Sequence, residues 1–95
     1  MLIPLNIVVK ENTQKLNIAI STAVNAAING DWQTAHNIAQ NYEENDTANW
    51  LYAVLHKMEG DTSNSQYWYS KTKDKSFKDF DDIRLELEAI LLNLK

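Results

Sequence analysis

Apolar residues recur at helical spacing along most of the chain. Between Thr13 and Asn29 they occupy positions i, i+3, i+4, i+7, i+8, i+11 and i+12, which fits one face of an α-helix and no β-strand. Similar stripes, some of them broad, predict helices over about 13–29, 32–42, 48–59, 62–72 and 83–94. The lysine-rich segment 73–78 interrupts the pattern and is expected to be a loop.

The boundaries of these helices carry familiar stop and start signals. Gly30 ends the first helix, and Asp31 can cap the second through its side-chain oxygen. Gly60 and Asp61 repeat the arrangement before the fourth helix. Asp46 or Thr47 is expected to cap the third helix, and the aspartates at 79, 81 and 82 favour the start of the fifth.

The amino end, residues 1–12, does not share the helical stripe. Its β-branched residues Ile7, Val8 and Val9 predict an extended arm that packs on the body or on a second subunit, with a helix as the alternative. The segment lacks a basic region and a cleavage site, and its apolar run is too short to cross a bilayer. We therefore expect no export signal and no membrane partner.

Length and composition narrow the classes of function. A chain of 95 residues is expected to form a single helical domain over 1–95. The absence of cysteine excludes disulfides, thiol catalysis and Cys-based metal sites, and it favours a cytoplasmic location. A net charge of −4 argues against nucleic acid as a partner, because that affinity depends on clustered Lys and Arg.

Two segments of the chain echo one another. GDWQTAHNIAQ begins at Gly30 and GDTSNSQYWYS at Gly60, and each has a small residue five places after the glycine, Ala35 and Ser65. The pattern resembles the turn and second helix of a tetratricopeptide repeat (TPR), although the spacing of 30 residues is shorter than the usual repeat of about 34. The predicted fold is all-α, with about five helices arranged as TPR-like antiparallel hairpins plus a closing C-terminal helix. A generic five-helix bundle is the alternative.

A longer segment, from His36 to Lys71, contains AHNIAQ and ANWLYAVLHKMEGDTSNSQYWYSK. It resembles an uncharacterised family of small bacterial and fungal proteins with the motif H-A-x-L-H-R-x-E-G-D-x-x-N-A-x-Y-W-Y. Tyr52 stands where that family commonly has a histidine, Lys57 where it has arginine, and Ser65 where it has alanine. The resemblance draws attention to these residues without implying a reaction.

Polar residues follow one line down the predicted third helix. Asn49, Tyr52, His56 and Glu59 fall at i, i+3, i+7 and i+10, opposite the apolar arc. Such a stripe faces solvent in an ordinary soluble helix, but these residue types also line clefts. If Asn64 approaches from the next helix, a third interpretation is a structural network of buried hydrogen bonds.

Three consecutive aromatic residues follow the second glycine turn. Successive helical residues turn by about 100°, so Tyr67, Trp68 and Tyr69 cannot all face the core. Trp68 or Tyr69 is the better core residue, and Tyr67 beside Lys71 is a plausible binding surface. The candidate binding cluster therefore comprises Asn49, Tyr52, His56, Glu59, Asn64, Tyr67 and Trp68.

Catalytic and metal chemistry have only a slender basis in the sequence. The chain has no Gly-rich phosphate loop, nucleophile elbow or triad order, so we assign no catalytic residue and lean towards a protein that is not an enzyme. We also expect no cofactor and no metal. If the fold brought His36, His56 and Glu59 together, however, they would form a two-histidine, one-carboxylate site.

The leading hypothesis is a non-catalytic helical module that binds a protein or peptide partner, or a second copy of itself. The closing segment from Ile83 to Leu94 motivates it, because Leu85 and Leu92 lie off its main apolar stripe. The competing hypothesis is a small-molecule or metal-binding protein with a polar pocket around His56.

Overall fold

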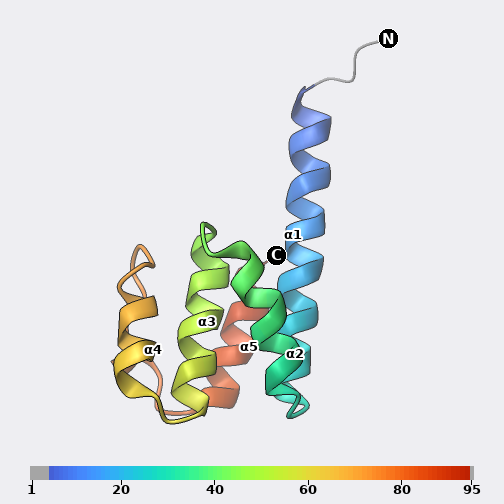
Figure 1. Cartoon of the computed structure of the whole chain (residues 1–95). Helices are drawn as coiled ribbons and strands as arrows, with labels where there is room; N and C mark the ends of the chain where they lie inside the picture. The colour runs from blue at the N-terminus through green and yellow to red at the C-terminus, as the bar shows by residue number, and fades with distance from the viewer. Residues whose placement is uncertain (1–4, 95) are drawn as a thin grey trace.

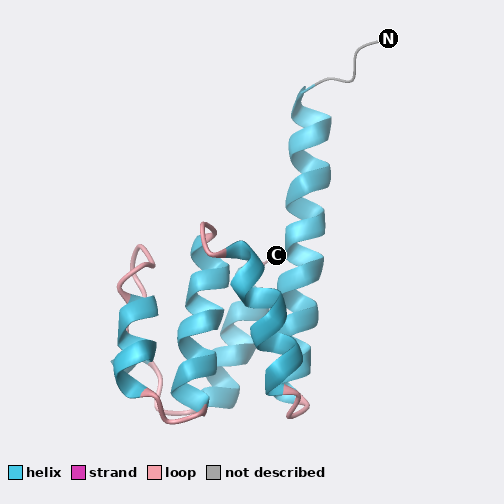
Figure 2. Ribbon diagram, viewed as in Figure 1, coloured by secondary structure: helices cyan, strands magenta, loops and turns pink. Residues whose placement is uncertain are grey.

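The computed structural model describes residues 5–94, and all regular secondary structure in this range is helical (Figures 1 and 2). The elements are α1 (Leu5–Ile28), α2 (Trp32–Ala39), the 3-10 turn η1 (Gln40–Tyr42), α3 (Asp46–Met58), α4 (Thr62–Tyr69), the 3-10 turn η2 (Phe77–Asp79) and α5 (Ile83–Asn93). The prediction of an all-α fold with about five helices is confirmed.

The helices form two antiparallel pairs and a closing helix. Figure 1 shows α1 running against α2, and α3 against α4, while α5 lies behind α3 and beside α1. The helix α3 packs against α1, α2, α4 and α5. It is therefore the centre of the bundle, and its residues from Ala48 to His56 are all buried.

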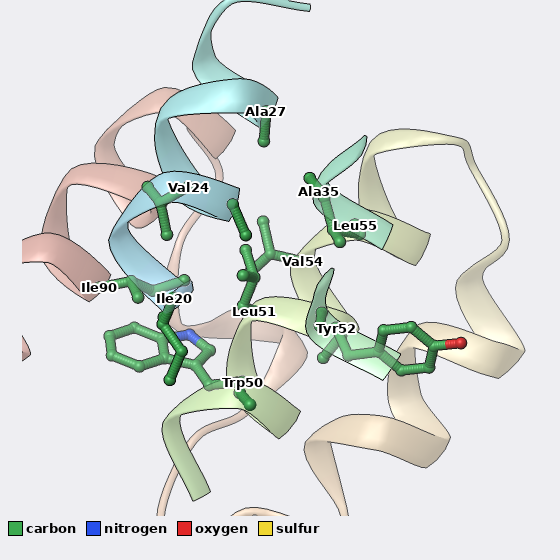
Figure 3. Packing of buried hydrophobic residues seen from close by; sticks show 14 of the residues in the cluster. Ile20, Val24, Ala27, Ala35, Trp50, Leu51, Tyr52, Val54, Leu55 and Ile90 are labelled. Atoms are coloured by element: carbon green, nitrogen blue, oxygen red, sulfur yellow. The ribbon is translucent and has the colours of Figure 1, made fainter. Parts of the chain in front are cut away.

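The hydrophobic core joins α1, α3 and α5. Ile20 and Val24 of α1, Leu51 of α3 and Ile90 of α5 are almost completely excluded from solvent (Figure 3). Tyr52 points away from this group on the opposite side of α3 (Figure 3). One side of α3 thus supplies the core, and the other side carries the polar residues discussed below.

Both glycine turns have the same backbone geometry. Gly30 and Gly60 adopt φ angles of 87° and 81°, a left-handed conformation that glycine tolerates without strain. The amide of the following aspartate reaches back to the helix it leaves, from Asp31 to the Ala26 carbonyl at 2.8 Å and from Asp61 to the His56 carbonyl at 3.0 Å. Each aspartate side chain also caps the next helix, as the sequence predicts.

The small residues of the sequence echo lie where two helices approach closely. Ala35 and Ser65 are both completely buried. The hydroxyl of Ser65 donates a hydrogen bond to the Ala53 carbonyl of α3 at 2.7 Å, so this buried polar group is satisfied. The two turns and the small residues that follow them therefore occupy corresponding places in the two hairpins.

Two boundary predictions are wrong. The amino end is not an extended arm within the described range, because α1 already begins at Leu5; residues 1–4 lie outside that range. The third helix is capped by neither Asp46 nor Thr47 but by Asn45, whose side chain accepts the Ala48 amide at 2.9 Å. β-branched residues such as those at 7–9 have only a slightly lower helix propensity than most residues. The neighbouring turns of the same helix are therefore sufficient to keep this segment helical.

The helix α1 extends well past the rest of the bundle. At a rise of about 1.5 Å per residue, its 24 residues span about 36 Å, against about 20 Å for the 13 residues of α3. Figure 1 shows its first turns standing clear of the other helices. No helix between residues 5 and 94 combines the length and the apolar character needed to span a membrane.

Candidate functional site

The predicted polar stripe of α3 is buried and faces α2 and α4. Asn49, Tyr52 and His56 expose less than a tenth of their surface, so the prediction of a solvent-facing stripe is wrong for them. Glu59, at the end of the helix, does reach solvent. A central helix in a small bundle is covered on every side, and its polar residues must then bond to one another or to its neighbours.

Aromatic and imidazole rings from three helices form one cluster at this face. His36 stacks on Trp32 within α2, with ring centroids 4.7 Å apart, and lies 4.8 Å from the ring of Tyr52 in α3. Tyr52 in turn meets His56 edge-on at 4.9 Å and Trp68 of α4 at 4.6 Å. The structure therefore brings together residues that the sequence placed on three separate helices.

Hydrogen bonds tie this cluster together. The hydroxyl of Tyr52 and Nε2 of His36 lie 2.8 Å apart, and Nδ1 of His56 lies 2.7 Å from Oε1 of Glu59. The Asn64 amide nitrogen is 3.4 Å from Nδ1 of His56 and 3.5 Å from its Nε2. His56, Glu59 and Asn64 thus share one spot at the mouth of the α3–α4 turn.

Two buried polar atoms of this face have no hydrogen-bond partner within the described part of the chain. They are Nδ1 of His36 and Oδ1 of Asn49. No hydrogen bond between residues 5 and 94 joins the Asn49 side chain to His56 or Glu59. The other predicted residues lie in three places. Tyr52, His56 and Trp68 belong to the ring cluster, and Glu59 and Asn64 contact His56. Tyr67 is exposed on α4.

The electrostatic environment favours the uncharged forms of His36 and Tyr52. Burial lowers the pKa of His36 below its ordinary value, the neighbouring His56 lowers it further, and Glu59 partly opposes both effects. The pKa of Tyr52 is raised by burial first, and then by the negative charges of Glu43 and Glu59. The His36–Tyr52 pair is accordingly a hydrogen bond between uncharged groups near neutral pH.

The aromatic residues of α4 separate as expected. Tyr69 is buried, Trp68 is half-buried against Tyr52, and Tyr67 exposes about half of its surface. The ammonium group of Lys71 lies 5.1 Å from the centroid of the Tyr67 ring. Tyr67 and Lys71 therefore form an exposed cation–π pair beside the buried cluster.

No protein-family model matches the chain, and no curated protein or solved structure is significantly similar to it.

A second polar cluster lies on the other side of α3 and has no counterpart in the sequence predictions. The completely buried carboxylate of Glu86 in α5 accepts hydrogen bonds from the Trp50 indole at 2.9 Å, from the Tyr69 hydroxyl at 2.6 Å and from the Lys57 ammonium group at 2.9 Å. Lys57 also donates to the carbonyls of Phe77 and Phe80, each at 2.8 Å. This cluster joins α3, α4, α5 and the η2 segment, and its members are mutually satisfied.

The position of Glu86 in the sequence could have indicated this second cluster. Glu86 lies three residues after Ile83 and four before Ile90, on the apolar stripe of the closing helix. A carboxylate on a core-facing stripe needs a buried donor, and Lys57 supplies the positive charge. The four side chains of the cluster bind one another, and their hydrogen bonds link α3, α4 and α5.

Tyr69 makes this second cluster sensitive to alkali. The pKa of Tyr69 is raised far above its ordinary value of 10.0, first by burial and then by its hydrogen bond to the negatively charged Glu86. The unfolded chain can ionise this hydroxyl above about pH 10, whereas the folded chain keeps it neutral. The contribution of Tyr69 to the free energy of unfolding is therefore complete below about pH 10 and is lost progressively as the pH rises from there towards the higher pKa of the folded state.

We expect the free energy of unfolding to fall above about pH 10 more steeply in the natural chain than in a Tyr69→Phe variant, by up to about 1.4 kcal/mol per pH unit. Urea unfolding of both chains at several pH values between about 8 and 11 measures the difference. Parallel pH profiles for the two chains would contradict the predicted pKa shift of Tyr69.

Proposed function

We propose that this chain is a non-catalytic self-association module that forms a homodimer through the face made by α1 and α5. The observation that carries the proposal is an open groove of about 650 Å³ between these helices. Ile18 of α1 and Leu92 of α5 line it and expose about two-thirds of their surface each. Large apolar side chains exposed together along a groove mark an interaction surface.

The chemistry of this groove favours an apolar partner. Leu91 and Leu94 continue the apolar lining, and Glu88 is its only charged residue among the described side chains. A strongly charged peptide or a nucleic acid would find no complementary charge there. An apolar helix of ordinary composition would be a suitable occupant.

A second copy of the chain satisfies this requirement. The first turns of α1 project past the bundle on the same helix that forms one wall of the groove (Figure 1). A two-fold axis relates identical surfaces, so two chains meeting along α1 would each bring a projecting helix to the partner's groove. This self-complementarity favours a homodimer over binding of an unrelated peptide.

The paired antiparallel hairpins also support an interaction role by analogy. Their arrangement is similar in outline to TPR hairpins, which stack to form extended binding surfaces. A peptide partner in the same groove is the alternative outcome. The α1–α5 face is preferred because its apolar residues Ile18 and Leu92 are exposed to solvent, whereas the space between α2 and α4 is filled by the ring cluster.

The test measures molar mass by light scattering during gel filtration over a range of concentrations. We expect the natural chain to approach twice its mass of 10.9 kDa, and Ile18→Lys or Leu92→Lys to shift it towards the monomer. Leu85→Lys is the matched control, because Leu85 is exposed on the same helix α5 but does not line the groove. A monomer at every concentration, or equal effects of Leu92→Lys and Leu85→Lys, would contradict the proposal.

A further inference from the structure

The turn between α3 and α4 carries three side chains with metal-binding atoms. His56 comes from the last turn of α3, Glu59 is the residue after that helix, and Asp61 caps α4. One ligand atom of each lies within 4.8 Å of those of the other two. We propose that His56, Glu59 and Asp61 bind a divalent transition-metal ion such as Zn²⁺.

The distances suit a tetrahedral ion after a small adjustment. Zinc bonds of about 2.1 Å to nitrogen and oxygen place ligand atoms about 3.4 Å from one another. Nδ1 of His56 and Oε1 of Glu59 lie 2.7 Å apart, at hydrogen-bond distance. A metal ion would take the place of this hydrogen bond, and the partly exposed Glu59 side chain would have to move by a fraction of an ångström.

The remaining carboxylate is already held in place. Oδ1 of Asp61 accepts the Asn64 backbone amide at 3.3 Å, and this bond leaves its second oxygen unused. None of the ion pairs in the described part of the chain gives Glu59 or Asp61 a lysine or arginine partner. Two carboxylates without a lysine or arginine partner would be neutralised by one divalent cation.

The rings behind His56 restrict its orientation, and solvent reaches the neighbouring Glu59. The His56 imidazole is buried against Tyr52 and His36 at centroid distances of 4.9 Å and 5.6 Å. Glu59, in contrast, exposes 41% of its side chain, which provides an entry path from solvent. A buried, oriented histidine beside an accessible carboxylate is the arrangement that a metal ligand set needs.

The first glycine turn shows that the backbone of such a turn does not require these ligands. The backbone at Gly30 and Asp31 is the same as at Gly60 and Asp61, including the aspartate cap. The positions equivalent to His56 and Glu59 there are Ala26 and Asn29. Because the turn forms without a histidine or a glutamate, their presence in the second turn calls for a role other than making the turn.

This set of ligands differs from the two-histidine site considered for the sequence. Nε2 of His36 is engaged with Tyr52, and His36 does not belong to the group of close ligand atoms in the described residues. Asp61 takes its place, so the site has one histidine and two carboxylates. Water or the Asn64 amide oxygen, after rotation of the amide, would complete the coordination.

The experiment titrates Zn²⁺ into the tag-free, chelator-treated chain of residues 1–95 by calorimetry and follows the melting temperature in parallel. We expect one ion per chain and a higher melting temperature when zinc is present. Glu59→Gln and Asp61→Asn should each weaken binding by about tenfold or more, because even outer-sphere changes cost 10- to 100-fold. Both replacements keep the shape of the side chain, and asparagine still caps a helix.

Asp31→Asn is the matched control, because it makes the same change at the cap of the equivalent turn. It should leave the zinc affinity unchanged, and His36→Gln should not abolish binding. The proposal is overturned if zinc does not bind, if Asp61→Asn and Asp31→Asn have equal effects, or if His36→Gln alone removes binding. The melting temperatures without zinc show whether each variant is folded.

Discussion

Replacing Glu86 by alanine should lower the free energy of unfolding by about 3 to 5 kcal/mol, the range measured when one member of a buried ion pair is removed. The buried Lys57 ammonium group would lose its only carboxylate in the described structure, and the Trp50 indole and the Tyr69 hydroxyl would lose their acceptor. Chemical denaturation followed by circular dichroism measures this change.

Arg84→Ala is the control on the same helix. Arg84 pairs with Glu88 at 3.1 Å one turn away, both side chains are exposed, and Arg84 does not line the α1–α5 groove. Surface pairs of this kind contribute only about 0.3 to 0.5 kcal/mol. A Glu86→Ala variant as stable as Arg84→Ala would show that the buried pair contributes little.

The coupling between Lys57 and Glu86 can be measured directly. Lys57→Met should also be strongly destabilising, and its combination with Glu86→Ala should cost less than the sum of the two by about 1 kcal/mol or more.

A chain that ends at Asp82 should fail to unfold cooperatively on heating. Removal of α5 takes Leu87 and Ile90 from the core and leaves the faces of α1 and α3 uncovered. It also removes the carboxylate of Glu86 from Lys57. The two hairpins that remain would be too small to bury a sufficient core, since domains of this size are already marginal.

A chain that ends at Asn93 is the control for this truncation. It retains all of α5 and loses Leu94, whose side chain packs at the edge of the core and lines the groove. It also loses the hydrogen bond from the Asn17 side chain to the Leu94 carbonyl at 3.2 Å, which is half-buried and worth about 1 kcal/mol. We expect it to melt cooperatively. If the chain ending at Asp82 melted with similar cooperativity, the hairpins would be independent repeat units and α5 an accessory helix.

Local signals in the sequence predicted the helices and their ends well. The Gly30 and Gly60 turns and their aspartate caps are determined by residues within one or two turns of each other, so the pattern suffices to find them. The extended arm was wrong because β-strand propensity at Ile7–Val9 is weak evidence without a partner strand. The segment instead continues the helical hydrogen bonding of the turns that follow it in α1.

The burial of the polar residues on α3 could not be predicted from local signals. Tyr52 and His56 lie opposite the apolar arc of α3, and only the packing of α2 and α4 on that side turns an outward-facing stripe into a buried one. Likewise, 29 residues separate Lys57 from Glu86. Spacing along one helix identifies a face, but it does not identify what covers that face.

The repeated glycine turn gives the chain two corners with the same backbone and different neighbouring side chains. Ala26 and Asn29 precede the first corner, and His56 and Glu59 precede the second. The first corner therefore serves as an internal reference for the second. Because the corner forms with either asparagine or glutamate before the glycine, replacing the exposed Glu59 should leave the turn itself intact.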